Sequence, residues 1–152
     1  MATLTATADG GNGRLRQAQR ADIAAIQRVR YGVRENRLTS SVVTDADVQA
    51  AIEITGRGWV IEAGGDVVAF AIGITGSGNI WALFVDPAYE RRGYGRLLHD
   101  TMVAWLWQQG LQSLWLTTQP GTRAQAFYET AGWQRAGVTQ HGEIRFELHA
   151  PA

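Results

Sequence analysis

The chain of 152 residues contains no cysteine and, among its 14 basic residues, no lysine. The lack of cysteine excludes disulfides, thiolate metal sites and a cysteine nucleophile. The lack of lysine excludes a nucleotide-triphosphate P-loop, because that loop needs a lysine after its last glycine. No apolar run approaches the length of a membrane span, and the N-terminal residues lack the basic and apolar regions of a signal peptide. We therefore expect a cytoplasmic protein without a membrane partner.

The charges balance, with 14 basic and 14 acidic residues, so no global field draws the chain to nucleic acid. Its length and its hydrophobic fraction of 45% suit one globular domain. Residues 1–13 are rich in Ala, Thr and Gly without apolar periodicity, and they predict a disordered tail before a single domain at residues 14–150. No spacing of His, Asp and Glu suggests a metal site, and no Ser-His-Asp set suggests a hydrolase.

The most informative stretch is residues 81–98, where an apolar strand leads through a loop of arginines and glycines into an amphipathic helix. The first turn of a helix carries N–H groups without internal partners and lies at the positive end of the helix dipole. Gly93 and Gly95 leave those donors unshielded, and Arg91, Arg92 and Arg96 add positive charge. This combination predicts a site for a phosphate-bearing ligand.

The spacing of the loop narrows the choice of ligand. A dinucleotide fingerprint would need a third glycine at Leu98, so that class is excluded. The segments Val85-Asp86-Pro87 and Glu90-Arg91-Arg92-Gly93-Tyr94-Gly95 resemble the acyl-CoA signature of the GNAT superfamily of N-acetyltransferases, Val-x-Pro followed by Gln/Arg-x-x-Gly-x-Gly/Ala. Glu90 departs from that pattern. On this short motif alone, the alternative is an ordinary strand–turn–helix with a solvated arginine cluster.

A second segment and the order of elements extend the resemblance from Leu15 to Leu148. Residues 121–133 resemble the family's C-terminal Asn-x-x-Ala-x-x-Phe-Tyr-x-x-x-Gly-Phe/Trp, with Gly121 in place of the asparagine. The predicted order is a strand, two helices, three antiparallel strands, a helix, a strand, a helix and two strands. The resemblance implies an α/β GNAT acyl-CoA N-acyltransferase fold, in which helices flank a mixed, mostly antiparallel central sheet with a splayed pair of parallel strands.

Local patterns set the expected boundaries. Asp22, Thr44 or Asp45, and Thr122 are the expected N-caps of three helices, and Gly110 is expected to end the long helix. The strands are expected at about 15–18, 58–63, 67–74, 80–85, 114–118, 133–136 and 144–148. We expect the strand at 114–118 to be buried on both faces, because it is an apolar run.

The resemblance also implies where the cosubstrate acetyl-CoA binds. The strands at 80–85 and 114–118 would diverge, and the pantetheine arm would pair with the N–H and C=O groups of Leu83, Phe84 and Val85, which the gap would leave free. The diphosphate would bind at the arginine–glycine turn. The implied cofactor-binding residues are Leu83, Phe84, Val85, Arg91, Arg92, Gly93, Tyr94, Gly95, Arg96, Thr122 and Tyr128.

Amine acetylation needs a group that protonates the leaving thiolate and a group that takes a proton from the amine. The resemblance implies that Tyr128 is the general acid, although it could equally be a packed helix residue. The strand at 80–85 offers no carboxylate, so Glu62 or Glu35 is the candidate base, with a water chain as the alternative. His99 follows a core position and is interpreted as a solvated or locally bonded histidine rather than as the base.

The resemblance implies an acceptor pocket near the first two helices and their loop, which include the arginine-rich segment 28–38, and near the loop before the last strand. Arg30, Arg34 or Arg37 could receive a carboxylate of the acceptor, with Tyr31 as an apolar wall, or this segment could be a solvated helix face. Trp81 and Phe84 suit a substrate wall or the core. The expected substrate-binding residues are Tyr31, Arg34 and Trp81.

The leading prediction is therefore an acetyl-CoA-dependent N-acetyltransferase that acts directly on the primary amine of a small molecule. Acetylation of a protein N-terminus or lysine is an alternative. A non-catalytic acyl-CoA sensor is another, because Gly121 replaces the family asparagine and the strand lacks a carboxylate. An exposed aromatic edge at Trp105, Trp107 and Trp115 would suit a homodimer, and the sequence leaves that point open.

Overall fold

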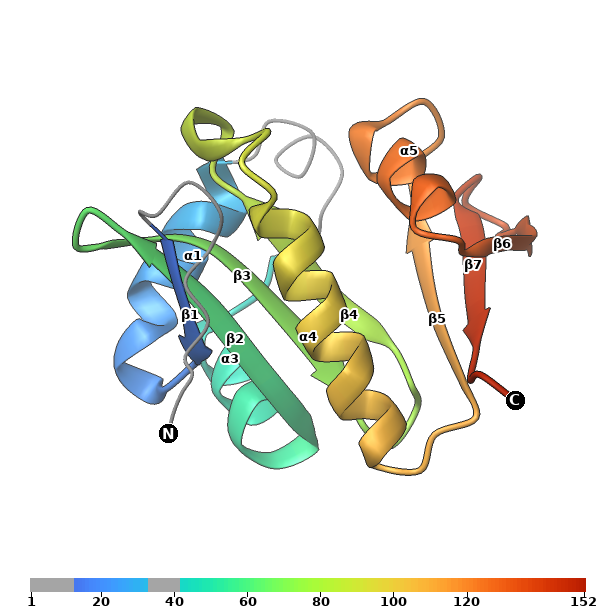
Figure 1. Cartoon of the computed structure of the whole chain (residues 1–152), viewed down its shortest axis with the longest axis horizontal. Helices are drawn as coiled ribbons and strands as arrows, with labels where there is room; N and C mark the ends of the chain where they lie inside the picture. Colours follow the sequence, from blue (N-terminus) through green and yellow to red (C-terminus); the bar gives the residue numbers. More distant parts are fainter. Residues whose placement is uncertain (1–12, 33–41) are drawn as a thin grey trace.

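A computed structural model describes residues 13–32 and 42–152 (Figure 1). Short 3-10 or π turns lie at Arg20–Asp22, Ala51–Thr55 and Pro87–Tyr89. The longer elements are β1 (Gly13–Gln17), α1 (Ile23–Gly32), α3 (Asp45–Ala50), β2 (Gly56–Ala63), β3 (Asp66–Ile74), β4 (Ile80–Val85), α4 (Tyr94–Gln108), β5 (Ser113–Thr118), α5 (Arg123–Thr130), β6 (Gln134–Val138) and β7 (Ile144–His149).

The strands form a four-stranded sheet in the order β1-β2-β3-β4 and a three-stranded sheet in the order β5-β7-β6. The two sheets meet where β4 and β5 begin, through a parallel bridge between Asn79 and Trp115. There the Trp115 N–H donates to the Gly78 carbonyl at 3.0 Å. Beyond this point the described residues form no ladder between β4 and β5, so the two parallel strands diverge (Figure 1). The predicted sheet with a splayed parallel pair is confirmed.

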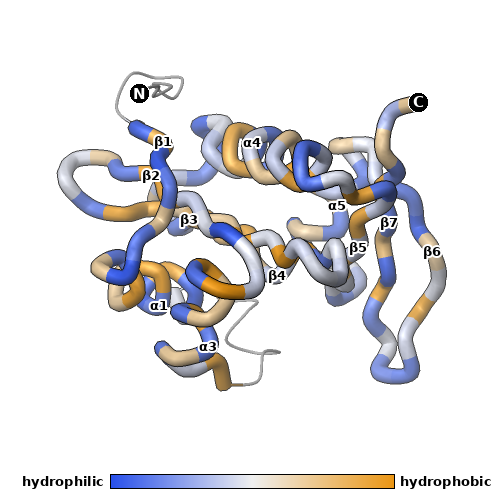
Figure 2. The backbone as a smooth tube through the Cα atoms, turned by 90° about the horizontal axis from the view of Figure 1, so that it is seen from below, coloured by the Kyte–Doolittle hydropathy of each residue, from blue (hydrophilic) through white to orange (hydrophobic). Residues whose placement is uncertain are grey.

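Two apolar cores cover the two faces of the first sheet. On one face, Leu98, Met102 and Leu106 of α4 pack with residues of β2 and β3, and this core continues under α5 to β5 and β7. On the other face, Ile26 of α1 and Val48 of α3 pack against alternate residues of β2 and β3. Figure 2 shows α4 and the α1–α3 pair on opposite sides of β3. The core on the α1 side contains no residue of β5, β6 or β7.

Several predicted boundaries are confirmed. Thr44 caps α3, because its hydroxyl accepts the Asp47 N–H at 3.1 Å while the Asp47 carboxylate accepts the Thr44 N–H at 2.9 Å. The Thr122 hydroxyl caps α5 by accepting the Gln125 N–H at 3.2 Å. The helix α4 ends before Gly110, whose φ of 90° only glycine adopts without strain.

Other expectations need correction. Asp22 does not cap α1; it ends a 3-10 turn, and its carboxylate accepts the Gln19 N–H at 2.8 Å. The strand β5 is buried on one face only, because Trp115 and Thr117 point away from the core and are partly exposed. Gly13 opens β1, and the rest of the predicted tail, residues 1–12, lies outside the described residues. Within the described ranges, no helix has the length and apolar character needed to cross a membrane.

Candidate functional site

A cavity of about 590 Å³ occupies the space between the diverging strands β4 and β5. Its walls come from the whole of β4, the loop from β4 to α4, the start of α4, the end of β5 and the start of α5. Of the predicted cofactor-binding residues, those that line the cavity are Leu83, Phe84, Val85, Arg91, Gly93, Tyr94, Gly95, Arg96, Thr122 and Tyr128. Arg92 is the exception. The fold thus gathers two sequence segments, near residues 80–96 and 116–128, around one space.

Alternate residues of β4 direct their backbone N–H and C=O groups either toward β3 or toward the gap between β4 and β5. Antiparallel strands bond through alternate residues. Asp86 donates to the Val68 carbonyl of β3 at 2.8 Å, and Phe84 lies opposite Phe70 in the same register. The N–H and C=O of Phe84 therefore face β3, whereas those of Leu83 and Val85 face the gap. This corrects the expectation that all three residues offer free main-chain groups.

The loop that precedes α4 is concave and rich in N–H donors. Arg91 has a φ of 66° and Gly93 a φ of 82°, so two residues in left-handed conformation lie close together before the first turn of α4. Such turns point successive N–H groups toward one spot and bind anions. A left-handed arginine is strained, and strain of this kind gathers at functional sites. The backbone here is thus shaped as an anion site at the positive end of α4.

The three arginines of the loop have different positions. Arg91 and Arg96 line the cavity, and Arg96 also pairs with Asp100 one turn along α4, with 3.0 Å between Nε and Oδ1. The Arg92 guanidinium instead lies 4.9 Å from the centre of the Tyr89 ring, at a separate shallow hollow. The prediction that Arg92 binds the cofactor is therefore not supported by its place.

Glu90, the residue that departs from the family pattern, forms an ion pair with Arg123 at the start of α5. The pair joins the loop before α4 to the helix on the far wall of the cavity. Its carboxylate is thereby compensated by a guanidinium, so Glu90 does not cancel the positive charge of Arg91 and Arg96. The departure is compatible with an anion site.

Tyr128 lies on α5, lines the cavity and is 6% exposed. Its ring packs edge to face against Phe127 and Trp133, with centroids 5.2 and 5.5 Å away. Burial raises the pKa of the Tyr128 phenol above its ordinary value of 10.0. The hydroxyl therefore stays protonated at neutral pH, so Tyr128 cannot serve as the base.

His99 is held in one tautomer by its two neighbours. The Trp133 indole N–H donates to His99 Nε2 at 2.9 Å, and His99 Nδ1 lies 2.8 Å from Oδ1 of Asp100. Because the indole can only donate, Nε2 accepts and the ring proton is on Nδ1. Burial lowers the pKa of His99 below 6.5. The ring is neutral with both nitrogens bonded, in agreement with its interpretation as a locally bonded histidine.

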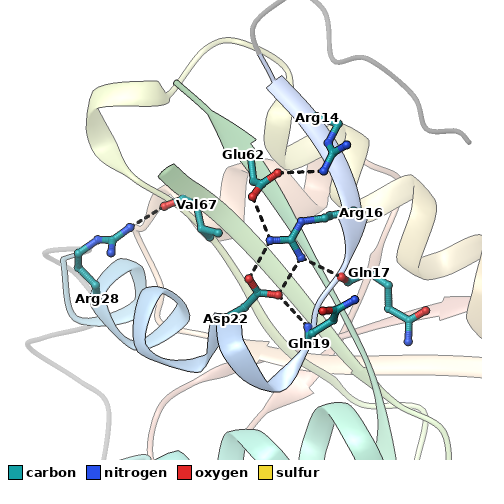
Figure 3. Close-up of polar contacts among 8 residues, drawn as sticks. All are labelled: Arg14, Arg16, Gln17, Gln19, Asp22, Arg28, Glu62 and Val67. Atoms are coloured by element: carbon teal, nitrogen blue, oxygen red, sulfur yellow. Dashed lines mark hydrogen bonds and ion pairs between the residues drawn. The ribbon is translucent and has the colours of Figure 1, made fainter. Parts of the chain in front are cut away.

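Glu62 does not lie in the cavity. It is on β2, where its carboxylate pairs with Arg14 at 3.2 Å and with Arg16 at 3.1 Å on the neighbouring β1 (Figure 3). Arg16 also bonds both oxygens of Asp22 at 2.8 Å, and it holds the pKa of the Glu62 carboxyl below its usual range. Its place and its ion pairs therefore give no support to the assignment of Glu62 as the base. The other candidate, Glu35, lies outside the described residues.

Of the expected acceptor-binding residues that the structure describes, one lines the cavity and one does not. Tyr31 does not line the cavity, because its hydroxyl accepts the Val43 N–H at 2.9 Å and so ties α1 to the segment before α3. Trp81 does line it. The buried guanidinium of Arg30 lies 5.1 Å from the Trp81 ring centre and 5.2 Å from that of Phe84, so these rings serve as both wall and core. The predicted residues Arg34 and Arg37 lie outside the described residues.

Two residues that the sequence interpretation missed also line the cavity, Thr118 and Glu143. Thr118 ends β5, and its buried hydroxyl has no hydrogen-bond partner among the described residues. Glu143 precedes β7 and is partly exposed. The loop before the last strand, where the resemblance implies acceptor contacts, contains Glu143, and the pairing of β5 with β7, which brings Thr118 opposite Ile144, places both residues at the cavity. Within the described ranges, no three His, Asp or Glu side chains gather as a metal ion would require.

Comparisons with known proteins agree with this geometry. The model of the acetyltransferase (GNAT) family matches residues 21–133. The curated [ribosomal protein bS18]-alanine N-acetyltransferases of Haemophilus ducreyi and Escherichia coli K12 are 30% and 31% identical to the chain over 79 and 80 residues. These matches cover 50% and 51% of this chain and 54% of each relative, so only about half the length of either protein is matched.

Solved structures share the fold over most of the chain. The ribosomal-protein-S18-alanine N-acetyltransferase of Escherichia coli superposes with a TM-score of 0.73 at 21% identity, over 90% of this chain and 93% of the other. The PaiA N-acetyltransferase of Thermoplasma acidophilum, solved in complex with coenzyme A, superposes with a TM-score of 0.77 at 12% identity, over 91% and 99%. At these identities the likeness concerns the fold.

Proposed function

Because the chain belongs to the acetyltransferase (GNAT) family, we propose that it transfers the acetyl group of acetyl-CoA directly to a primary amine. One observation carries the proposal: a single cavity joins the anion-binding loop before α4 to the unpaired edge of β4. Coenzyme A presents the matching chemistry, a diphosphate followed by an arm with two amides and a thioester.

The loop fits the diphosphate. The left-handed residues Arg91 and Gly93 turn main-chain donors toward the cavity, and the guanidinium groups of Arg91 and Arg96 add charge. Backbone N–H groups at a helix start, together with arginines, are a common way to hold phosphate. The residues present therefore suit the anionic end of the cosubstrate, with Arg92 outside the contact.

The wall between β4 and β5 fits the amide arm. Leu83 and Val85 direct N–H and C=O groups into the gap, and an added strand-like partner would satisfy them. The buried, unpartnered hydroxyl of Thr118 lies on the opposite wall. Buried polar groups without partners are costly, so both walls would gain from a polar arm between them. One of the β4 N–H groups would then stabilise the oxyanion that forms on the thioester carbonyl.

Tyr128 is the proposed general acid. In direct transfer the amine nitrogen attacks the thioester carbon, a C–N bond forms, and the C–S bond breaks with release of a thiolate. The phenol is protonated at neutral pH and lines the cavity, so it can donate a proton to that thiolate. Its place on α5, beside the cavity and behind the β4 gap, is consistent with this role.

The acceptor we propose is a primary amine beside a small apolar group, carried by a small molecule. Trp81 supplies an apolar wall on the face of β4 away from α4. The second candidate is the α-amino group of a protein, because the relatives named above are ribosomal-protein alanine N-acetyltransferases. Both acceptors present the same nitrogen chemistry and differ in the size of the molecule that carries the amine.

The test measures thiol release from acetyl-CoA with three acceptors: phenylethylamine, alaninamide and a hexapeptide that begins with alanine. We expect release that depends on the acceptor and saturates with it. Higher kcat/KM for the two small amines supports the small-molecule acceptor, whereas higher kcat/KM for the peptide supports the protein N-terminus. Saturable binding of acetyl-CoA without release for any amine would identify a binding module and refute the proposed activity.

A further inference from the structure

The described part of the chain places two carboxylates on the wall of the cavity, Glu90 and Glu143. They differ in their surroundings. Glu90 is paired with Arg123, so its charge is compensated. The carboxylate of Glu143 has neither an ion pair nor a hydrogen bond with any described residue. Glu143 is therefore the one uncompensated carboxylate that lines the cavity in residues 13–32 and 42–152.

The pairing of β7 with β5 brings Glu143 to the gap. Ile144 lies opposite Thr118, the last residue of β5, so Glu143 lies just beyond the end of that strand. Side chains alternate along a strand. Ile144 and Phe146 point into the core under α4 and α5, so the intervening Arg145 points to the other face, and Glu143 continues the row of Arg145.

This other face is the one from which an acceptor can approach. Thr117 of β5 projects from it, and Trp81 of β4 packs with the core on the α1 side, so both reach the cavity from the face away from α4. The anion-binding loop and Tyr128 belong to the opposite face, with α4 and α5. The cavity thus has groups for an anionic cosubstrate on one face and an uncompensated carboxylate on the other.

The backbone at Glu143 is fixed by a tight turn. The Glu143 carbonyl accepts the Thr139 N–H at 2.8 Å, and the Glu143 N–H donates to the Thr139 hydroxyl at 3.2 Å. Gly142, with a φ of 82°, allows the turn to close. A carboxylate on an anchored backbone is held near one place, as a group that acts on a bound substrate requires.

We propose that Glu143 is the carboxylate that receives the ammonium form of the acceptor and takes its proton. This inference rests on the proposed acetyl transfer. One proton passes from R–NH₃⁺ to Glu143, and the freed lone pair forms the C–N bond at the thioester carbon. When the C–S bond breaks, Tyr128 gives its proton to the thiolate and recovers one from the new amide nitrogen. The proton on Glu143 leaves to solvent, so the products are the amide, the free thiol of coenzyme A and one H⁺.

Arg145 and His141, the charged and titratable neighbours of Glu143 on its own strand and turn, each have a partner. Arg145 bonds Glu147 at 3.0 Å and lies 4.7 Å from the centre of the Trp115 ring. His141 in the same turn is exposed and contacts Gln140. On the other walls lie the pair of Glu90 with Arg123, the loop arginines and Tyr128. The expected pH dependence of the Glu143→Gln deficit is therefore assigned to the protonation of the amine itself.

The experiment compares the full-length wild type with Glu143→Gln and a matched control, Glu129→Gln, at an exposed position on α5 outside the cavity. The readout is kcat/KM for phenylethylamine, with acetyl-CoA saturating, from pH 6.5 to 9. General base catalysis contributes on the order of 100-fold or more, so we expect at least that loss in Glu143→Gln at pH 7 and none in the control. Glu143→Asp should recover part of the rate.

A second readout separates proton removal from simple binding. Without its base the enzyme can use only free amine, so the deficit of Glu143→Gln should shrink about tenfold for each pH unit until the amine titrates. The KM for acetyl-CoA should stay within about twofold of the wild type, which shows that the cavity is folded. A deficit that is absent, or that is constant with pH, overturns the role of Glu143. If the wild type itself shows no acceptor-dependent release, the proposed function fails instead.

Discussion

Replacing Thr118 by valine should make the ligand-free protein more stable and should weaken its binding of coenzyme A. Thr118 is 7% exposed, and its hydroxyl is buried without a partner among the described residues. Valine keeps the β-branched shape that suits a strand and removes only this polar atom. The two effects have opposite signs, and this makes the substitution informative.

The sizes follow from the environment of the hydroxyl. A buried polar group without a hydrogen bond costs about 1–3 kcal/mol, so its removal should raise the free energy of unfolding by about 1 kcal/mol or more. For a domain of this size that corresponds to a rise in Tm of about 2–4 °C. If the hydroxyl bonds the amide arm in the complex, valine forfeits about 0.5–1.5 kcal/mol of binding, a Kd that is about 2- to 10-fold higher.

Thermal melting without ligand and titration calorimetry with coenzyme A measure the two quantities. Thr118→Ser is the matched control, because it keeps the hydroxyl and loses a methyl group. Serine should lower the stability by about 1 kcal/mol through the lost methyl and leave the Kd for coenzyme A near that of the wild type. A Thr118→Val variant that melts lower than the wild type and binds coenzyme A equally well would refute the reasoning, since the hydroxyl would then have a structural role alone.

Further substitutions test the remaining assignments. Arg96→Ala should weaken coenzyme A binding several-fold, with a smaller effect at high salt, whereas Arg92→Ala, outside the cavity, should leave the Kd within about twofold. Tyr128→Phe should lower kcat by about 100-fold or more without changing the Kd for coenzyme A, and stopped-flow thiol release checks it. Burial lowers the pKa of His99 below 6.5 in the folded protein. As the pH falls through 6.5, the unfolded chain therefore takes up a proton before the folded protein does, and the folded protein loses stability. Tm should therefore drop more between pH 7 and 5 in the wild type than in His99→Gln; equal drops would contradict this.

The parts of the site that could be predicted from the sequence are those that depend on adjacent residues. The turn before α4 is contiguous, so the glycines and arginines that shape it indicate an anion site without knowledge of the fold. Tyr128 is placed by a short helix whose N-cap, Thr122, is also local. The order of strands and helices then fixes which two segments meet at the cavity. The turn and the helices needed only the periodicity of side chains and the chemistry of helix ends, whereas the meeting of the two segments and the role of Tyr128 were implied by the resemblance to the GNAT family.

Where a partner lies far along the chain, the same reasoning failed. Glu62 is neutralised by Arg14 and Arg16, which are 46 or more positions away and reach it only because β1 pairs with β2. The side chain of Tyr31 is occupied by the backbone of Val43. No local sequence pattern indicates such pairings. A carboxylate or phenol without a neighbouring partner in the sequence can therefore be fully hydrogen-bonded in the fold.

The expected place of Arg92 in the cavity is not observed, for a different reason. Its neighbour Arg91 adopts a left-handed conformation, and this changes the direction of the side chains after it. The side chains of these consecutive arginines therefore point in different directions. Arg91 lines the cavity, and Arg92 packs on the ring of Tyr89. The sequence shows that the loop is positively charged, whereas the direction of each arginine side chain depends on the backbone angle at Arg91.

The net charge of zero conceals a separation of charge across the sheet. Arg91 and Arg96 line the cavity from the side of α4, and the uncompensated carboxylate of Glu143 lines it from the other side. An anionic thioester and a cationic amine would each be attracted to a different face of the same opening, and each would be repelled from the face of the other. Because β4 and β5 are bridged only at their start in the described structure, the sheet itself provides the passage through which the two reactants meet. In the proposed reaction, the splay would therefore allow a protein of zero net charge to bind two oppositely charged substrates from different faces.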